Sequence, residues 1–479
     1  MNLAFVLFTF FPFGGLTRDM LAIARECRAR GHRVRVYAGE CRGDAPADID
    51  LHIIPASTKT GLVPTPTKTG PAQPPGPAEN HLAAPPAASA NHGPPPPTSA
   101  KTDLAPPAGP AETHLAAPPA ASASHGPPPP AGPAETHPLP ALGKNLPALC
   151  RRLKTPLTNP GKNRRFAAQL SRVVAEFAPH LVVGFNKMPG LDLYYAADDC
   201  FADKCEERGW LYQLTPRARQ AVAFERAVFG VQSSTDIMLI APKQLAIFRR
   251  FYATPDARMT LLPPGISRDR IAGDDENVAL ARRRNFRRQW RLNDDDILLL
   301  AVGSGYQTKG VDRTLAAFAS LPSAWRERAH LFIVGGGKAP PLEKMARRLG
   351  VHSRVRFTGG RTDVPEFLLA ADVLIHPARQ EAGGIVLLEA LVAGLPVIAT
   401  DVCGYAPYLT QAGLGCVLAS PFEQPALNRA LREFIERTDT DRDNWRAHGR
   451  TFAATADIYD MPRYACGVIE GVGERRGRS

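Results

Sequence analysis

Two carboxylates, Glu381 and Glu389, are separated by seven residues within HPARQEAGGIVLLEALVAGLPVIAT, the segment that runs from His376 to Thr400. Glu389 falls in a stretch otherwise made of Ile, Val, Leu and Ala. An unpaired buried carboxylate costs several kcal/mol, so this one requires hydrogen-bond donors, and the hydroxyl groups of a ligand are suitable ones. A structural alternative stays open, in which Glu381 is an acid at a helix start and Glu389 pairs with a nearby arginine.

Glycines and a lysine near these acids suit an anionic ligand. Gly383 and Gly384 open the helix that carries Glu389, and the free backbone amides at a helix N-terminus favour an anion such as a phosphate. In GSGYQTKG, which follows a strand and opens a helix, Lys309 can reach a diphosphate as a point charge. An exposed lysine at a helix start is the alternative. The glycine spacing does not fit a Walker A loop.

The second half of the chain alternates between strands and helices, which predicts a doubly wound parallel sheet. The predicted strands are 297–302, 331–334, 355–357, 373–376 and 396–400, and the predicted helices are 311–321, 342–349, 364–371 and 384–393. In such sheets ligands bind beyond the carboxyl ends of the strands, where the strand order reverses.

The first half opens as a strand, a helix and a second strand, which again predicts a parallel sheet. Further strands are expected at 181–185, 237–240 and 260–262, and one or two helices at 194–229. PPG at 263–265 predicts the domain boundary. We therefore expect an N-terminal domain at 1–264, a C-terminal domain at 265–455, and a helix with a basic tail at 456–479 that returns to the first domain. The ligand site is expected in the cleft between the two domains.

Residues 58–141 contain about half of the chain's 47 prolines and repeat themselves. GPAENHLAAPPAASANHGPPPP begins at Gly76, and GPAETHLAAPPAASASHGPPPP begins at Gly109. Prolines lack the amide hydrogen and the other residues are small, so we expect a disordered insert with polyproline II character.

Composition narrows the class of protein. A net charge of +12 indicates either solvated helix faces or attraction to an anionic surface. None of the eight cysteines has CxxC or zinc-site spacing, which favours free thiols in a reducing compartment. The apolar N-terminus is too short to cross a bilayer and is interpreted as the first buried strand. A soluble or peripheral cytoplasmic protein is expected.

The set of motifs resembles the retaining glycosyltransferases of family 4, which have the GT-B fold of two Rossmann-like domains facing across a cleft. Within that family the chain resembles the lipopolysaccharide core glucosyltransferases over nearly its whole length except the insert. The segments that carry the resemblance are FPFGGLTRDM, VVGFNKMPGLD, YYAADDCFADK, AFERAVF, LLPPGI, GSGYQTKGVDR and HPARQEAGGIVLLEALVAGLPV.

The resemblance implies roles for the acids and for the amides between them. Glu381 would contact the donor sugar and Glu389 the ribose hydroxyls. The amides around Gly383, Gly384 and Ile385 would face the sugar and the diphosphate.

The same resemblance assigns the remaining donor contacts. Lys309 and the amides of Gly14 and Gly15 would lie near the diphosphate, and Asp19 near the sugar. For Gly14, Gly15 and Asp19 the alternative is an ordinary glycine turn with an acid in the first turn of a helix.

Arg361 is a candidate near the uracil. Thr308 stands where the family usually has a basic residue, so one phosphate contact is either lost or made by a nearby arginine. We expect no metal, because lysine, arginine and helix amides can stabilise a leaving diphosphate.

Two segments are candidates for the acceptor side. In FNKMPGLD, Asp192 is a catalytic candidate or a helix cap, and Lys187 is an acceptor-side candidate. In ERGWLYQLTPRARQ, aromatic and basic residues together suit an anionic membrane interface, with a plain solvated helix as the alternative. The residues proposed for membrane contact are Arg208, Trp210, Tyr212, Arg217 and Arg219.

The function implied by the resemblance is retaining transfer of glucose from UDP-glucose to an inner-core heptose of lipopolysaccharide. The expected location is the cytoplasmic face of the inner membrane, without a nucleic-acid partner. Transfer of another UDP-hexose, transfer to another glycan, a UDP-sugar epimerase and a non-catalytic UDP-sugar sensor stay open as alternatives.

Overall fold

The structure is a computed structural model that describes residues 1–12, 14–54, 160–271 and 275–477. Its N-terminal part is built on a parallel sheet. Within these residues the strand order is β3-β2-β1-β4-β5-β6-β7, and every pair is parallel. The strands are β1 (Asn2–Phe10), β2 (Arg33–Cys41), β3 (Leu51–Ile53), β4 (Leu181–Gly184), β5 (Leu193–Ala196), β6 (Asp236–Leu239) and β7 (Met259–Leu261). The order reverses between β1 and β4, so ligands are expected beyond the carboxyl ends of those two strands.

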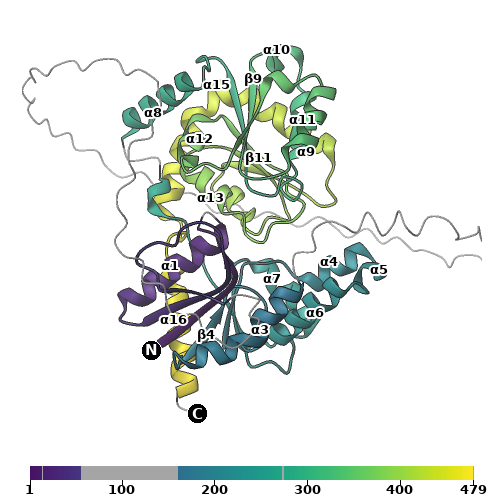
Figure 1. Ribbon diagram of the computed structural model, residues 1–479. Helices are drawn as coiled ribbons and strands as arrows, with labels where there is room; N and C mark the ends of the chain where they lie inside the picture. The colour runs from purple at the N-terminus through teal and green to yellow at the C-terminus, as the bar shows by residue number, and fades with distance from the viewer. Residues whose placement is uncertain (13, 55–159, 272–274, 478–479) are drawn as a thin grey trace, which may run out of the picture. The chain divides into compact units, whose positions relative to one another are not determined.

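Helices cover both faces of this sheet. Alternate residues of β1 enter two different cores: Leu3 and Phe5 pack with α1 and α16, while Ala4 and Val6 pack on the opposite face. Figure 1 shows α1 and α16 side by side, although one is near the start of the chain and the other ends it. The helices on this sheet are α1 (Gly15–Ala29), α3 (Pro160–Ala175), α4 (Phe201–Arg208), α5 (Trp210–Gln213), α6 (Pro216–Phe229), α7 (Pro242–Tyr252) and α16 (Met461–Gly477).

The second sheet is also parallel. Among the described residues its strand order is β10-β9-β8-β11-β12-β13, with the reversal between β8 and β11. Its strands are β8 (Ile297–Val302), β9 (Ala329–Val334), β10 (Val355–Gly359), β11 (Val373–His376), β12 (Val397–Thr400) and β13 (Gly415–Leu418). The helices are α8 (Glu276–Gln289), α9 (Val311–Ala319), α10 (Ser323–Arg326), α11 (Ala339–Arg348), α12 (Val364–Ala370), α13 (Ile385–Val392), α14 (Pro407–Gln411) and α15 (Gln424–Thr455).

The predicted fold class, two doubly wound α/β domains, is confirmed. All the described residues belong to one compact unit, and the predicted insert at 58–141 lies outside the described residues. One local prediction is wrong: residues 194–229 are not only helical, because Leu193–Ala196 forms β5. LYYA is buried along its whole length, and a short apolar run of this kind has no periodicity that separates strand from helix.

A buried charge cluster holds the second sheet to its helices. The carboxylate of Asp372, which precedes β11, accepts hydrogen bonds from the backbone of Leu298 and from Arg283 on α8 and Arg442 on α15. Burial raises the pKa of Asp372, but the surrounding arginines outweigh burial and the pKa stays below its ordinary value. The cluster therefore fixes the start of β11, the strand whose far end carries the candidate site.

Replacing Asp372 with Ala should destabilise the protein by about 3–5 kcal/mol, because it leaves buried arginines without their counter-charge. The measurement is chemical unfolding followed by circular dichroism. Asp363→Ala, which breaks an exposed pair with Arg361, is the matched control and should change stability by less than about 1 kcal/mol. Equal effects of the two substitutions would contradict this role of Asp372.

Candidate functional site

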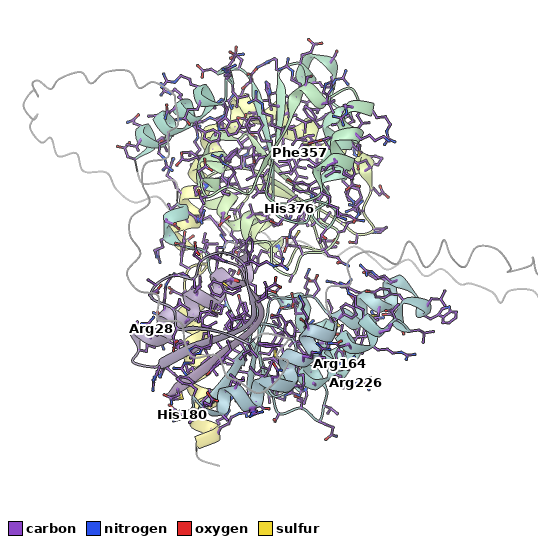
Figure 2. All side chains as sticks on the ribbon, viewed as in Figure 1. Arg28, Arg164, His180, Arg226, Phe357 and His376 are labelled. Carbon is purple, nitrogen blue, oxygen red and sulfur yellow. The ribbon has the colours of Figure 1, made fainter. Side chains whose placement is uncertain are left out.

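Glu381 lies in the loop after β11 and meets two cations of its own domain. Lys309 Nζ, from the loop after β8, forms an ion pair with Glu381 Oε2, and His376 Nε2 lies 3.3 Å from the same oxygen. His376, labelled in Figure 2, is the last residue of β11. The reversal of strand order between β8 and β11 thus brings these three side chains together.

The charges of this cluster are fixed by their mutual contacts. Burial raises the pKa of Glu381, but the hydrogen bond from His376 and the charge of Lys309 outweigh it and bring the pKa to about 2. Burial lowers the pKa of His376, but its contacts with Cys403 and Glu381 outweigh it and raise the pKa to about 9. At neutral pH Glu381 is therefore a carboxylate that can accept hydrogen bonds, and His376 is a cation.

Glycines shape the loops around Glu381. Gly384, the residue before α13, has φ +98°, a conformation that disfavours any side chain. A Cβ on Gly310 would overlap the carbonyl oxygen of Pro377, so glycine permits the two loops to touch. A Cβ on Gly383 would come 2.9 Å from the ring of Tyr405. The first helical residue after these glycines is Ile385, whose backbone amide lies at the N-terminus of α13.

Glu389, on α13, is buried and has arginine neighbours. Arg18 Nη1 lies 3.8 Å and Arg270 Nε 3.6 Å from Glu389 Oε1. The arginine pairing considered as the structural alternative is therefore present. Both separations exceed an ordinary N–H···O hydrogen bond, so these arginines balance the charge without saturating the oxygen.

The start of α1 contributes Gly14, Gly15 and Asp19. Gly14 is the residue before α1, and the space that a Cβ on Gly15 would enter is open. Tyr195 Oη, at the end of β5, donates a hydrogen bond of 2.9 Å to Asp19 Oδ2. Burial raises the pKa of Asp19 to about 6, more than the bond from Tyr195 and the charge of Arg18 lower it. Glu389 also raises the pKa of Asp19, which shows that the two carboxylates are near each other.

Lys243, which sequence reasoning missed, contacts the Glu381 loop. Its Nζ donates to the backbone oxygen of Glu381 at 2.8 Å and to that of Val402. Burial lowers the pKa of this lysine. The signal in the sequence was its position in IAPKQ, directly after β6, where parallel strands place ligand-side residues.

Two acceptor-side candidates have structural partners. Lys187 Nζ donates to the fully buried Glu225 at 2.5 Å and to the backbone oxygen of Asp199 at 2.6 Å. Asp192 accepts from the backbone of Val182, at the amino end of β4, and pairs with Arg476. Asp192 thus lies at the amino ends of the strands, whereas Asp19 lies near their carboxyl ends. Asp192, a catalytic candidate from the sequence, immediately precedes β5 and therefore does not lie beyond the carboxyl ends of the strands, where ligands are expected.

Arg361 and Thr308 lie toward the surface. Arg361 forms a bidentate pair with Asp363 at 2.8 and 2.6 Å. The backbone oxygen of Thr308 accepts from the amide of Arg379, whose guanidinium pairs with Asp312. Arg379 is therefore the arginine that stands beside the position where the family usually has a basic residue.

The proposed membrane segment exposes apolar side chains. Trp210, Leu211 and Leu214 are 69%, 66% and 51% exposed on or next to α5. Arg208 lies over the ring of Tyr212, and Arg217 and Arg219 are exposed on α6. Large apolar groups at this exposure are unusual on a helix that faces water alone.

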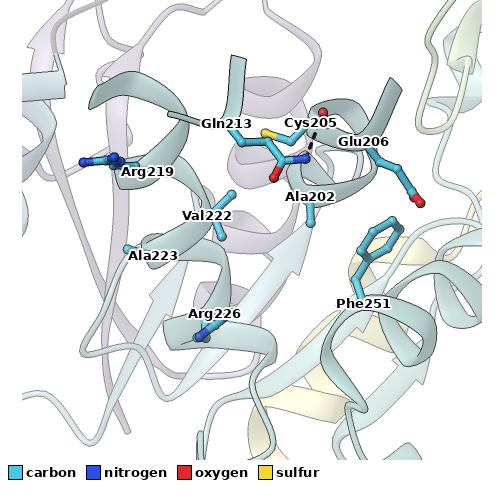
Figure 3. Close-up of a pocket in the computed structure, with 9 residues that line it drawn as sticks. All are labelled: Ala202, Cys205, Glu206, Gln213, Arg219, Val222, Ala223, Arg226 and Phe251. Atoms are coloured by element: carbon cyan, nitrogen blue, oxygen red, sulfur yellow. Dashed lines mark hydrogen bonds between the residues drawn. The ribbon is translucent and has the colours of Figure 1, made fainter. Parts of the chain in front are cut away.

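A cavity of about 600 Å³ lies beside this segment, between α4, α6 and α7 (Figure 3). Its lining residues are Ala202, Cys205, Glu206, Gln213, Arg219, Val222, Ala223, Arg226 and Phe251. None of the lining residues belongs to the Glu381 cluster.

Among the described residues, no helix combines the length and the apolar character that crossing a bilayer requires.

This chain matches a protein-family model over part of its length and a known protein over nearly all of it. The family model for glycosyl transferases group 1 matches residues 282–452, which contain the Glu381 cluster. The lipopolysaccharide glucosyltransferase WaaG of Escherichia coli (strain K12) is 36% identical over 472 residues, which cover 98% of this chain and 99% of that protein.

Solved structures agree with this relationship. The crystal structure of WaaG, a glycosyltransferase involved in lipopolysaccharide biosynthesis, aligns with a TM-score of 0.74 at 36% identity and covers 98% of this chain and 100% of that one. Anabaena Alr3699/HepE in complex with UDP-glucose shares the fold, with a TM-score of 0.61, 14% identity, and coverage of 98% and 100%. The fold is that of a GT-B glycosyltransferase. The chain belongs to the group 1 glycosyltransferases, in the family of lipopolysaccharide glucosyltransferases.

Asp19→Asn should raise the melting temperature at pH 8 and leave it unchanged at pH 4. The folded pKa of about 6 lies above the ordinary 3.8, so the stability that Asp19 contributes is lost as pH rises through 6. Asparagine avoids that loss. The measurement is thermal unfolding at both pH values.

Asp48→Asn is the control of opposite sign, because the hydrogen bond from Arg25 lowers the pKa of that exposed carboxyl. It should not stabilise the protein at pH 8. The quantity compared is the difference in melting temperature between Asp19→Asn and the unmodified protein. The same difference at pH 4 and at pH 8 would contradict the raised pKa of Asp19.

Proposed function

We propose that this enzyme transfers glucose from UDP-glucose to a heptose of the lipopolysaccharide inner core, with retention of configuration. The observation that carries the proposal is the ion pair of Glu381 with Lys309, in the loop between β11 and the N-terminus of α13. The full-length relationship to a lipopolysaccharide glucosyltransferase supports the choice of sugar and acceptor.

The cluster suits a sugar nucleotide because its groups match the parts of that ligand. Lys309 and the amides at the start of α13 would meet the diphosphate, and Glu381 would accept hydrogen bonds from the sugar hydroxyls. In this structure Lys309 and Glu381 form an ion pair with each other. A bound donor would give Lys309 the diphosphate and Glu381 the sugar hydroxyls as new partners, while His376 stays beside Glu381.

Glu389 and Asp19 would complete the donor contacts. Glu389 has arginines beyond hydrogen-bond distance, so it can accept bonds from the ribose hydroxyls. Asp19 comes from the other domain, and its pKa of about 6 leaves it mostly ionised at pH 7.5 to accept a bond from the sugar.

Retention requires that the acceptor enters on the face that the diphosphate leaves. The bond from the sugar C1 to the phosphate oxygen breaks, and the heptose hydroxyl oxygen bonds to C1. The departing phosphate oxygen takes the hydroxyl proton, and UDP leaves. Glu381 orients the sugar in this scheme and forms no bond to it. Lys309 and the α13 amides would meet the charge on the leaving group, so we propose that transfer requires no metal ion.

We also propose that the enzyme docks peripherally on an anionic membrane through the segment 208–219. Its exposed tryptophan and leucines would enter the interface, and the arginines beside them would meet anionic headgroups. This places the acceptor lipid near the N-terminal domain.

The proposed reaction is tested with purified protein, UDP-glucose and lipopolysaccharide truncated to its heptose. UDP release that requires the acceptor, with a gain of one hexose mass on the lipid, is expected. Release without a mass gain would indicate donor hydrolysis. Conversion of the donor to another UDP-hexose would indicate an epimerase, and either result would overturn the proposal.

Glu381→Gln should lower kcat by about 100-fold or more, because the amide keeps the shape but loses the negative charge. Glu389→Gln is the matched comparison and should mainly raise the KM for UDP-glucose. Initial rates across donor concentrations measure both, and circular dichroism checks that each variant is folded. A Glu381→Gln enzyme with unchanged kcat would remove Glu381 from the donor-sugar contact.

The double substitution Trp210→Ser and Leu211→Ser should weaken binding to phosphatidylglycerol vesicles about tenfold or more, because two exposed apolar groups no longer enter the interface. Vesicle sedimentation measures the affinity. Val278→Ser, at a similarly exposed residue of α8, is the control and should bind as the unmodified protein does. Equal binding by the double variant would show that this segment does not dock.

A further inference from the structure

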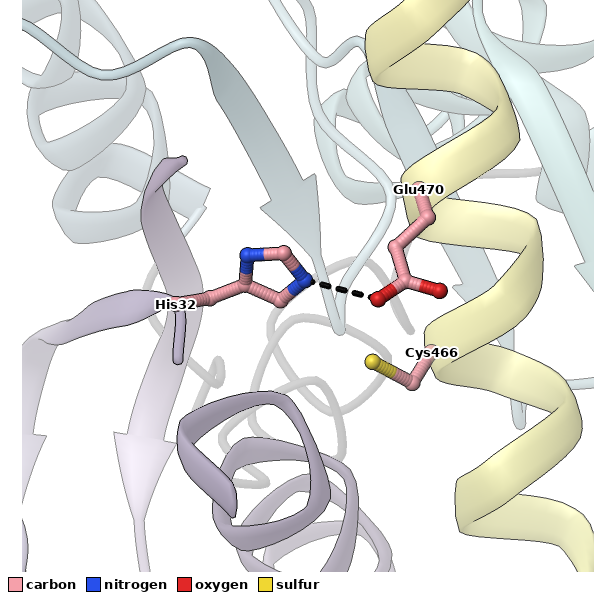
Figure 4. Close-up of side chains that lie close together, drawn as sticks. All are labelled: His32, Cys466 and Glu470. Carbon is pink, nitrogen blue, oxygen red and sulfur yellow. Dashed lines mark hydrogen bonds and ion pairs between the residues drawn. The ribbon is translucent and has the colours of Figure 1, made fainter. Parts of the chain in front are cut away.

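The contact between the C-terminal helix and the N-terminal sheet contains a group of metal-ligating side chains away from the Glu381 cluster. Cys466 and Glu470 lie on α16, and His32 lies just before β2. Figure 4 shows the three side chains pointing toward one another from these two elements. Cys466 is fully buried, whereas His32 and Glu470 are partly exposed, so solvent can reach the group from one side.

The geometry is close to that of a metal site. One ligand atom of each residue, an imidazole nitrogen, the Cys466 sulfur and a Glu470 oxygen, lies within 4.8 Å of the other two. Zinc bonds of 2.0–2.3 Å in a tetrahedron place neighbouring ligand atoms about 3.3–3.8 Å apart. Cys466 and Glu470 are four residues apart on one helix, which puts them on the same face. Small side-chain movements therefore bring all three atoms onto one ion.

Arg30 and His32 orient the carboxylate of Glu470. Arg30 Nη1 holds Glu470 Oε2 at 3.0 Å, while Oε1 faces His32 Nε2 at 2.9 Å. A ligating carboxylate commonly has its second oxygen held in this way.

We propose that His32, Cys466 and Glu470 bind one divalent transition-metal ion of the zinc class. A thiolate, an imidazole and a carboxylate together suit Zn²⁺, and a water molecule would complete four-coordination. Binding releases the thiol proton of Cys466 to solvent and requires an unprotonated Nε2 on His32. His32 Nδ1 lies 3.2 Å from the N-terminal ammonium of Met1, so on binding that ammonium would pass a proton to Nδ1 while Nε2 releases its own to solvent. Affinity therefore rises with pH. The ion would tie α16 to the first sheet through residues up to 438 positions apart.

The alternative is a group without metal, in which Glu470 forms an ion pair with Arg30 and His32 while Cys466 is only a buried thiol. The protein itself offers a matched comparison, since His52 Nε2 lies 2.8 Å from Asp50 Oδ1 and no third ligand among the described residues lies beside that pair. A histidine and an acid without the thiol should bind zinc weakly.

The test uses the full chain, stripped with a chelator and then titrated with Zn²⁺. Bound zinc is measured by mass spectrometry after gel filtration, and the melting temperature is measured in parallel. The unmodified protein and His52→Asn should bind one equivalent more zinc than His32→Asn or Cys466→Ser, and only the former two should be stabilised through this site. The histidines outside the described residues are present in every variant, so they cancel in the difference.

Equal zinc content and equal stabilisation of all four proteins would overturn the proposal. Because Cys466 is buried, its variant could fail to fold, so Co²⁺ titration of the unmodified protein and His32→Asn gives a second measurement. A thiolate-to-cobalt charge-transfer band that His32→Asn loses supports the site. Absence of that band in the unmodified protein, or its full retention in His32→Asn, overturns the site.

Discussion

The site depends on one electrostatic constraint, the ionisation of a largely buried carboxylate. Glu381 would be neutral in that position without donors, since burial by itself raises its pKa. Lys309 and His376 reverse this effect, and they reach Glu381 because β8 and β11 are neighbours at the reversal of strand order. The strand order of the second sheet therefore decides the charge of the residue proposed to orient the donor sugar.

Other features of the fold serve the same constraint. The buried Asp372 cluster fixes the beginning of β11, and His376 occupies its end. Gly310 and Gly384 let the loops that carry Lys309 and Glu381 come together. Lys243 donates to the backbone of the Glu381 loop. Asp19 responds to the charge of Glu389, so the ionisation of one proposed donor contact influences another.

The sequence predicted β8 and β11 because each is an apolar run within a regular alternation of strands and helices. It missed β5, a buried run of the same kind as β11, because helical segments follow it directly and no such alternation marks it. It identified Glu381, Glu389 and Lys309 as candidates from their types and spacing. It could not foresee that His376 and Lys243 contact Glu381, nor that Asp192 lies at the amino ends of the strands, since those contacts arise from segments far apart or from a turn within a loop. The group of His32, Cys466 and Glu470 has no local spacing signal for the same reason.

The central claim, that a protonated His376 helps hold Glu381 ionised, is tested most directly by nitrogen NMR of the histidine side chains. The His376 signal is assigned in labelled protein by its loss in His376→Gln. The account predicts an imidazolium at pH 7.5, with both ring nitrogens protonated, that titrates with a pKa near 9. A neutral His376 at pH 7.5, with one unprotonated ring nitrogen, would contradict the account.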